Sequence, residues 1–213
     1  MSSTTLVHLM RHGEVFNPAK ILYGRIPGYK LSERGIAMAE LVAEHFVNAD
    51  ITHLVSSPLE RAMQTAAPLS RVKNLTINQD LNLLEATNVF EGKRVSVGDG
   101  VLRKPAAWRH LWNPFKPSWG EPYVEIFARM QTAVEAARIA AYGHQAVLVS
   151  HQLPIWIARL GFERKRFAHN PNHRECNLAS VTTLKFLEDQ LVSVSYLEPA
   201  AALYKESTGG VGA

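Results

Sequence analysis

Three consecutive residues near the start of the chain carry the groups that phosphoryl transfer requires. Arg11 supplies a fixed fork of donors that suits phosphate oxygens, and His12 supplies a nitrogen nucleophile that works near neutral pH. Gly13 lacks a Cβ, which lets a bound group approach the backbone closely. A short tripeptide also matches by chance, so a salt bridge from Arg11 and a strand-capping role for His12 are the alternatives.

A second buried strand also ends on an imidazole. Residues 6–10 are mostly apolar and lead into Arg11 and His12, and residues 145–150 lead in the same way into His151. Ligands of open α/β sheets bind just beyond the carboxyl ends of such strands. Two strands that each finish on histidine are hard to attribute to packing, and they indicate one shared site.

Two further charged residues suit the same site. Arg61 lies in the first turn of a helix that we predict to start at Pro58, and helix starts favour anions. A surface salt bridge from Arg61 to Glu60 or Glu33 is the alternative. Glu85 ends an apolar run, and burial raises a carboxyl pKa and suits it to protonating a leaving group. A solvated carboxylate at a helix start is the other interpretation of Glu85.

The elements that must position these residues follow from apolar runs and helical periodicity. Together they predict an α/β fold, a three-layer α/β/α sandwich with a mostly parallel central sheet. We expect strands at 6–10, 51–56, 75–77, 145–151, 178–186 and 190–196, and helices at 32–47, 58–69, 122–142 and 155–160.

Glycine and proline recur between residues 86 and 122, where the periodicity fades. We expect a single domain over residues 1–213, with an irregular or helical cap inserted roughly at 86–122 and a flexible tail at 207–213. The cap holds six cations, between Lys93 and Lys116, against one anion, Asp99. An anionic ligand explains this charge best, and nucleic acid is the competing explanation, without a supporting motif.

The composition predicts a cytoplasmic protein that can bury a large core. The chain has 213 residues, of which 46% are hydrophobic and 20% charged. The single cysteine, Cys176, excludes an internal disulfide, and the first residues lack the features of a secretory signal. No apolar run approaches the ~20 residues that span a bilayer. A metal site from His169, His173 and Cys176 is an alternative, but zinc usually needs a further ligand, so we expect no metal and no cofactor.

Taken in order, these motifs resemble the histidine phosphatase superfamily, which includes cofactor-dependent phosphoglycerate mutases and many phosphatases. The matching segments run from the first strand to the last histidine, and their common order is far more specific than any one of them. They are Arg11-His12-Gly13-Glu14, Leu31-Ser32 with Gly35, Ser56-Ser57-Pro58-Leu59 with Arg61-Ala62 and Gln64-Thr65-Ala66, Leu84-Glu85, Gly120-Glu121 and Ser150-His151.

The resemblance implies a role for each catalytic residue. His12 becomes the phosphorylated nucleophile, Arg11, Arg61 and His151 bind the phosphoryl oxygens, and Glu85 acts as general acid and base. It implies a metal-independent phosphatase that hydrolyses a phosphomonoester through a phosphohistidine.

The chain also departs from the family pattern. Val15 and Pro18 replace a Ser or Thr and an Asn, and Gln152 replaces a glycine. We expect Asn17, Gly24, Gln152 and Arg94 to bind substrate, and Ser150 and Glu14 to orient the pocket. The segment after Glu85 lacks the tyrosine and paired arginines with which the mutases grip a carboxylate, which favours a phosphatase over a mutase.

Three functions stay open at this stage: a phosphatase, a mutase, and a non-catalytic protein that binds a phosphorylated ligand. The expected partner is a small phosphorylated molecule, and the basic cap suggests a leaving group with extra negative charge. We expect neither nucleic acid nor a membrane as partner, and a homodimer is left open.

Overall fold

A computed structural model describes residues 3–89, 91–93 and 120–206. Its centre is a mixed six-stranded sheet with the order β3-β2-β4-β1-β5-β6. The pairs among β3, β2, β4 and β1 are parallel, while β5 and β6 run antiparallel along the other edge. The strands are β1 (Thr4–Arg11), β2 (Ile51–Ser56), β3 (Asn78–Gln79), β4 (Gln145–Ser150), β5 (Val181–Leu187) and β6 (Gln190–Leu197).

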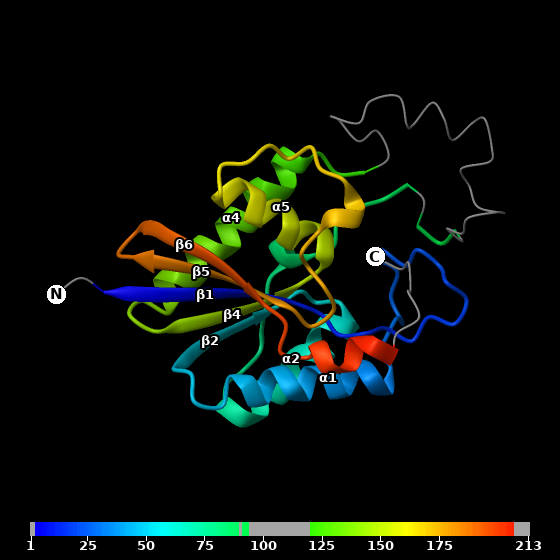
Figure 1. Ribbon diagram of the computed structural model, residues 1–213, viewed down its shortest axis with the longest axis horizontal. Helices are drawn as coiled ribbons and strands as arrows, with labels where there is room; N and C mark the ends of the chain where they lie inside the picture. Colours follow the sequence, from blue (N-terminus) through cyan, green and yellow to red (C-terminus); the bar gives the residue numbers. More distant parts are fainter. Residues whose placement is uncertain (1–2, 90, 94–119, 207–213) are drawn as a thin grey trace.

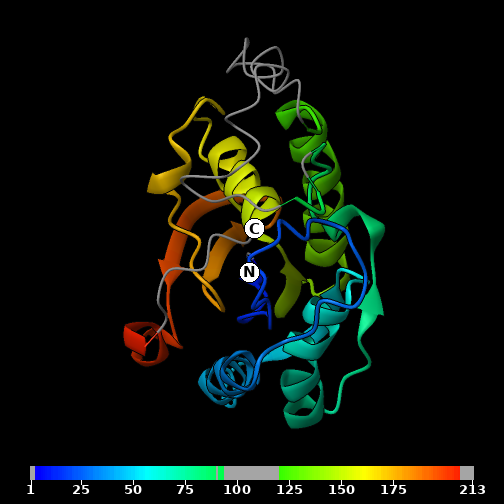
Figure 2. The ribbon, with the colours of Figure 1, turned by 90° about the vertical axis from the view of Figure 1, so that its right-hand side faces the viewer.

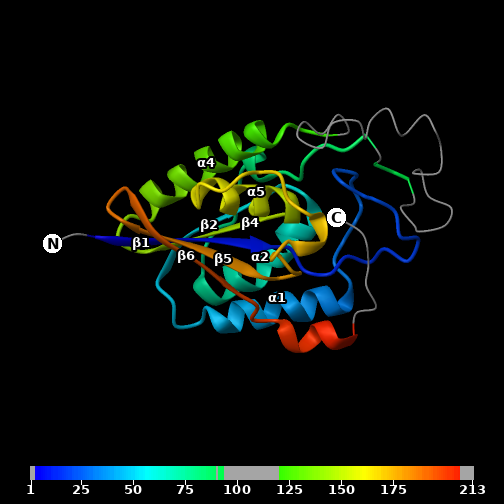
Figure 3. The same ribbon diagram turned by 45° about the horizontal axis from the view of Figure 1, so that its top comes forward.

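Helices cover both faces of this sheet. Helices α1 (Glu33–His45) and α2 (Glu60–Lys73) lie against one face, and α4 (Tyr123–Ala140) and α5 (Gln152–Phe162) lie against the other (Figure 1, Figure 3). The predicted three-layer α/β/α architecture is therefore confirmed. Three short 3-10 turns complete the described elements: η1 (Leu81–Leu83), η3 (Pro171–His173) and η4 (Ala201–Glu206).

The central strands bury side chains on both faces, which explains their continuous apolar runs. In β1, Val7 and Leu9 pack into the cluster under α4 and α5, while Met10 packs into the cluster over α1 and α2. In β4, Leu148 and Val149 alternate in the same way. Two apolar cores thus fix β1 and β4 side by side in the middle of the sheet.

The carboxyl ends of β1, β2 and β4 meet at one edge of the sheet. Arg11 pairs with Ser150 in the register of β1 and β4, and the amide of His12 donates to the carbonyl of Ser150 at 3.1 Å. The amide of Ser57 donates to the carbonyl of Val149 at 2.9 Å, so β2 ends beside them. Figure 2 views the molecule from this end, where the loop after β1 crosses above α1 and α2.

Two glycines set the close contact between the end of β1 and the start of α1. A Cβ on Gly13 would lie 2.5 Å from the carbonyl oxygen of Gly35, and one on Gly35 would lie 2.0 Å from that of Glu14. Glu14 itself accepts hydrogen bonds from Ser32 and Arg34 at the start of α1. In the structure the missing Cβ of Gly13 lets its backbone approach Gly35, and the Glu14 side chain is bonded to the start of α1. The expected roles of Gly13 toward a ligand and of Glu14 in orienting the pocket stay predictions.

Several predicted boundaries differ from the observed ones. Helix α2 begins at Glu60 and not at Pro58, because Leu59 is still extended, with φ −68° and ψ 136°. The third strand lies at 78–79 instead of 75–77, where it pairs with Val55 and Ser56. Helix α5 begins at Gln152, so that Pro154 lies in its first turn, where a missing N–H costs no helical hydrogen bond.

Some predictions fall outside the described residues. Most of the predicted cap, with Arg94 and three of the tryptophans, and the tail at 207–213 belong to this part of the chain. The single-domain assignment and the cap therefore stay predictions. Within the described ranges, no helix is both long and apolar enough to cross a lipid bilayer.

Candidate active site

His12 presents one ring nitrogen to the site and uses the other to fix its tautomer. Its Nδ1 lies 2.8 Å from the carbonyl oxygen of Gly13, and a carbonyl only accepts, so Nδ1 carries the hydrogen. Its Nε2 is buried without a hydrogen-bond partner among the described residues. Burial, Arg61 and Arg11 hold the pKa of His12 well below its usual value. The ring is thus neutral, with a free lone pair on Nε2.

Arg61 is a buried cation that stands over an aromatic ring. Its side chain is 1% exposed, and its guanidinium carbon lies 4.7 Å from the ring centroid of Tyr23. Its Nη2 donates to the carbonyl oxygen of Gly24 at 2.6 Å, and its Nε has no partner in the described part of the chain. Burial lowers the pKa of Arg61. The alternative, a salt bridge to Glu60 or Glu33, is absent among the described residues. Glu60 accepts a hydrogen bond from the amide of Gly28.

Arg11 is held by a carbonyl from a distant segment. Its Nη1 donates to the carbonyl oxygen of Cys176 at 2.7 Å, and the residue is 7% exposed. Arg11 also acts electrostatically on His12 and Glu85, which places its charge in the same site. The segment before β5 therefore supports the end of β1 from outside the parallel part of the sheet.

His151 faces His12 across the site. The ring centroids lie 5.1 Å apart, and His151 is fully buried at the N-cap of α5. Its Nε2 lies 2.9 Å from the hydroxyl of Ser57, while its Nδ1 has no partner among the residues described. Burial, Arg61 and His12 hold the pKa of His151 well below its usual value, so the ring is neutral. With Ser57 as donor, Nδ1 carries the hydrogen and can donate to an anion beside the positive end of α5.

Glu85 is a buried carboxyl beside these cations. Its Oε1 accepts from the amide of Ala86 at 2.8 Å, and its Oε2 has no hydrogen-bond partner in the described residues. Burial raises the pKa of Glu85, although Arg61 and Arg11 oppose the shift. A buried carboxyl whose pKa is raised in this way is suited to giving a proton to a leaving group.

The backbone around Glu85 is clamped by two arginines. The Nε of Arg25 donates to the carbonyl of Glu85 at 2.5 Å, and Nη1 of Arg129 donates to that of Leu84 at 2.7 Å. Both arginines pair with Glu121, which is 13% exposed. Glu121, which matched the family motif, thus joins the start of α4 to the loop that carries Glu85.

Thr65 ties the nucleophile loop to α2. Its hydroxyl accepts from the amide of Gly13 at 3.0 Å and donates to the carbonyl of Arg61 at 2.7 Å. Sequence reasoning gave no role to Thr65, Tyr23 or Ser57. Thr65 and Ser57 lie inside the motifs that carried the resemblance, which is the one signal that pointed to them.

A cavity of about 180 Å³ opens beside Glu85. Besides Glu85 its walls include Tyr123, Leu153 and Arg174, together with loop residues near Gly24 and Asn88. Glu85 thus connects the cavity with the cluster of Arg11 and Arg61 that shifts its pKa. The cavity therefore lies beside the carboxyl group that is suited to protonating a leaving group.

The predicted substrate-binding residues have mixed positions. Gly24 lines the cavity at φ +41°, where a Cβ would meet the Glu91 side chain at 2.2 Å. The side-chain amide of Asn17 donates to the carbonyl of Ile21 and accepts from its backbone amide, and these hydrogen bonds close the loop that carries Asn17. Gln152 contacts the carbonyl of Cys176 and the guanidinium of Arg174. Arg94 lies outside the described residues.

The proposed metal ligands do not converge. Both ring nitrogens of His169 are hydrogen bonded, one to the carbonyl of Phe167 and one to Nε of Arg174. Cys176 is buried, which raises the pKa of its thiol to about 11. Within the described ranges no group of three His, Cys, Asp or Glu side chains could hold a metal ion.

Comparison with known proteins shows which family and which known structures this chain is similar to. The family model of the histidine phosphatase superfamily, branch 1, matches residues 7–198. An uncharacterized Mycobacterium tuberculosis protein, Rv0525, is 52% identical over 94% of this chain and 100% of its own length. A probable phosphoglycerate mutase GpmB of Yersinia pestis is 32% identical over 70% of both chains. The structure of Bacillus stearothermophilus YhfR is similar in fold, with a TM-score of 0.76, 23% identity, and coverage of 88% of this chain and 94% of that one.

Proposed function

Because the chain belongs to the histidine phosphatase superfamily, we propose that it is a phosphatase that hydrolyses phosphomonoesters through a phosphohistidine on His12. One observation carries the proposal. The Nε2 of His12 is a buried lone pair, held in one tautomer by the carbonyl of Gly13 and surrounded by Arg11, Arg61 and His151. A neutral imidazole among cations is arranged to attack a bound phosphoryl group.

In the first step, Nε2 of His12 attacks phosphorus and the bond from phosphorus to the ester oxygen breaks. The carboxyl of Glu85 gives its proton to that oxygen, so that a neutral alcohol leaves. Arg11, Arg61 and the Nδ1 hydrogen of His151 donate to the phosphoryl oxygens and compensate the charge that spreads over them.

In the second step, the Glu85 carboxylate takes a proton from a water molecule that attacks the phosphohistidine. The bond from nitrogen to phosphorus breaks, inorganic phosphate leaves, and His12 regains its lone pair. Glu85 is protonated again at the end of the cycle, so protons balance. The chain's own residues supply every proton transfer in this scheme, and we therefore propose turnover without a metal.

The experiment is release of phosphate from an aryl phosphate in the presence of a chelator. His12→Ala should abolish turnover and the covalent phosphoenzyme, because the nucleophile is gone. His144→Ala is the matched control, since this exposed histidine pairs with Asp50 on the surface. Full activity in His12→Ala, or dependence on an added metal, would contradict the proposal.

A mutase is the second candidate, favoured by the 32% identity to the probable phosphoglycerate mutase. The chemistry of His12 is the same, but the phosphoryl group returns to another position of the substrate. A mutase must exchange phosphate between positions of one molecule and depend on a bisphosphate primer. Measurement of both, beside phosphate release to water, separates the two functions.

A binding protein without turnover is the third candidate. Binding needs the arginines but no proton donor, so the raised pKa of the buried Glu85 favours an enzyme. Equal affinity for a phosphate mimic in the native protein, with no turnover on a broad substrate panel, would support the binding role. A cytoplasmic location and a homodimer stay predictions.

A further inference from the structure

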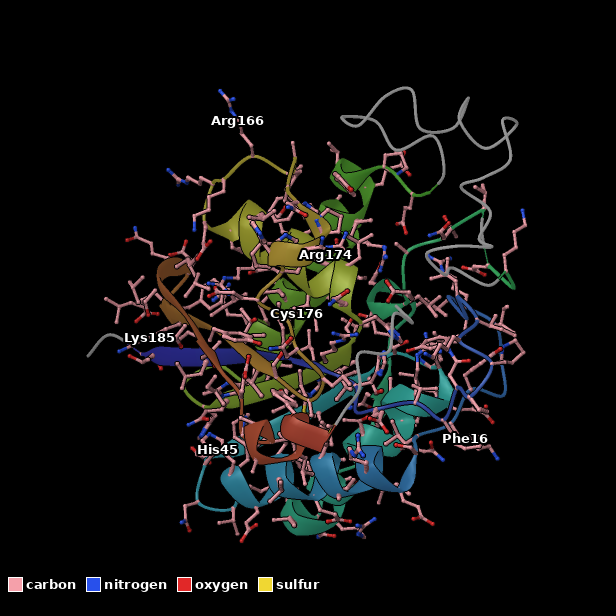
Figure 4. The ribbon with its side chains drawn as sticks, turned by 45° about the vertical axis from the view of Figure 1, so that its right-hand side comes forward. Phe16, His45, Arg166, Arg174, Cys176 and Lys185 are labelled. Carbon is pink, nitrogen blue, oxygen red and sulfur yellow. The ribbon has the colours of Figure 1, made fainter. Side chains whose placement is uncertain are left out.

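Arg174 is a cation in the wall of the leaving-group cavity, opposite in charge to any acidic substrate. It follows η3 directly and lies close to Cys176 on the chain segment that leads to β5 (Figure 4). Glu85 lines the same cavity. Arg174 therefore faces the space that the leaving alcohol would fill, whereas Arg11 and Arg61 serve the phosphoryl group.

The guanidinium of Arg174 is held in position by neutral groups. Its Nε donates to Nε2 of His169 at 2.9 Å, and its Nη1 approaches Oε1 of Gln152 at 3.5 Å. Gln152 in turn donates to the carbonyl of Cys176, the same carbonyl that accepts from Arg11. The departure from the family glycine at Gln152 thus positions a cation beside the cavity.

Among the described residues, no carboxylate forms an ion pair with Arg174, although Glu85 acts on its charge from across the cavity. The other acidic group of the cavity, Glu121, is already paired with Arg25 and Arg129. Glu85 is the proton donor, and its pKa is raised by burial. A half-buried cation without an ion pair favours a ligand that brings an anion.

We propose that Arg174 binds a second anionic group, a carboxylate or a phosphate, on the alcohol that leaves. The protein would then select phosphomonoesters of acidic alcohols over those of neutral ones. This inference rests on the proposed function and goes beyond it, because it names the substrate class and the residue that reads it.

The test compares substrates that differ in one group. Glycerate 3-phosphate and glycerol 3-phosphate differ in a carboxylate, and 1,3-propanediol bisphosphate and its monophosphate differ in a phosphate. We expect the native protein to prefer the acidic member of at least one pair by kcat/KM, and the pair that shows the preference identifies the anion. Arg174→Gln should reduce kcat/KM about 10- to 100-fold for that acidic substrate and less than about 3-fold for its neutral partner.

Arg166→Gln is the matched control. This substitution removes the same charge from the same segment of the chain. The Arg166 side chain, however, is exposed and points away from the fold (Figure 4). It should leave the ratio between acidic and neutral substrates unchanged. Equal losses for both substrates in Arg174→Gln, or no preference in the native protein, would overturn the inference.

A binding measurement separates this inference from the proposed function. In the His12→Ala background, titration calorimetry gives the affinities for the two members of each pair without turnover. If Arg174→Gln lowers the ratio of affinities for the acidic and the neutral member, the inference is supported, even when no substrate is hydrolysed. Absence of hydrolysis would refute only the proposed phosphatase activity. If the native protein hydrolyses these substrates but Arg174→Gln leaves the affinity ratio unchanged, only the inference is refuted.

Discussion

The rings of His12 and His151 lie with their centroids 5.1 Å apart, although 138 residues separate them in the chain. The parallel pairing of β1 with β4 brings both to one edge of the sheet. Each is neutral, because burial and the nearby arginines hold its pKa well below the usual value. One ring is arranged as a nucleophile and the other as a hydrogen-bond donor.

This pair predicts different losses for the two histidines. His151→Ala should lower kcat about 10²- to 10³-fold, the usual effect of removing one donor to a transition state, and phosphohistidine should still form slowly. His12→Ala should form none. Rapid quench with labelled substrate, followed by isolation of the acid-labile phosphoenzyme, measures both. A phosphoenzyme in His12→Ala would place the nucleophile elsewhere.

Glu85→Gln should slow phosphoryl transfer from alkyl phosphates much more than from aryl phosphates. An alkoxide leaves poorly without a proton, so we expect a loss of about 10²- to 10⁴-fold for the alkyl ester, while a nitrophenolate needs no protonation to leave. Single-turnover rates of phosphoenzyme formation measure both. Equal losses for the two esters would remove Glu85 from the acid role.

The same carboxyl sets a pH dependence. Phosphoenzyme formation from an alkyl phosphate needs protonated Glu85, so its rate should fall as pH rises through the pKa of that group. Burial raises this pKa, which moves the loss to higher pH than for an exposed glutamate. The alkaline limb should vanish in Glu85→Gln, and pH profiles of both proteins test this.

Thr65→Val should destabilise the fold and slow the reaction. The change keeps the shape but leaves the amide of Gly13 buried without an acceptor, which costs about 1–3 kcal/mol. It also frees the nucleophile loop from α2. Thr65→Ser keeps the hydroxyl and is the control, with stability and kcat close to those of the native protein. Denaturant unfolding measures the effect on stability, and steady-state kinetics measures the effect on kcat. Equal stability and equal kcat in Thr65→Val and Thr65→Ser would contradict the role of the Thr65 hydroxyl.

His8 should make the fold less stable in acid. It is buried in β1, bonded to Thr183 and Gln145, and burial lowers its pKa from 6.5 to about 4. The unfolded chain therefore binds a proton on His8 near pH 6.5, whereas the folded chain binds it only near pH 4. The free energy of unfolding falls as the pH falls from 6.5 to 4. The total loss of unfolding free energy from this titration is about 3 kcal/mol.

His8→Gln removes this titration and is the matching measurement. The difference in unfolding free energy between the native protein and His8→Gln should shift by about 3 kcal/mol between pH 7 and pH 4, in favour of the variant. A constant difference across this range would show that His8 does not control acid stability.

Much of the scaffold was readable from local pattern. Apolar runs marked the strands, and Ser32 marked the start of α1 as its N-cap. The expected stop at Gly143 lies three residues beyond the last residue of α4, Ala140. The boundaries of α2, β3 and α5 were wrong by two to four residues, since strand pairing decides where a chain leaves the sheet. Local preference is weak at such points, and tertiary contacts override it.

By itself, the sequence determined the chemical groups and the order of elements that carry them, because residue types and periodicity are local properties. It also named His12, Arg61, His151 and Glu85 as one set through the resemblance. Only the tertiary structure decided which nitrogen of His12 is free and that Gln152 holds Arg174. Those facts depend on contacts between residues far apart in the chain, and they form only when the sheet and its two helical layers close around the site.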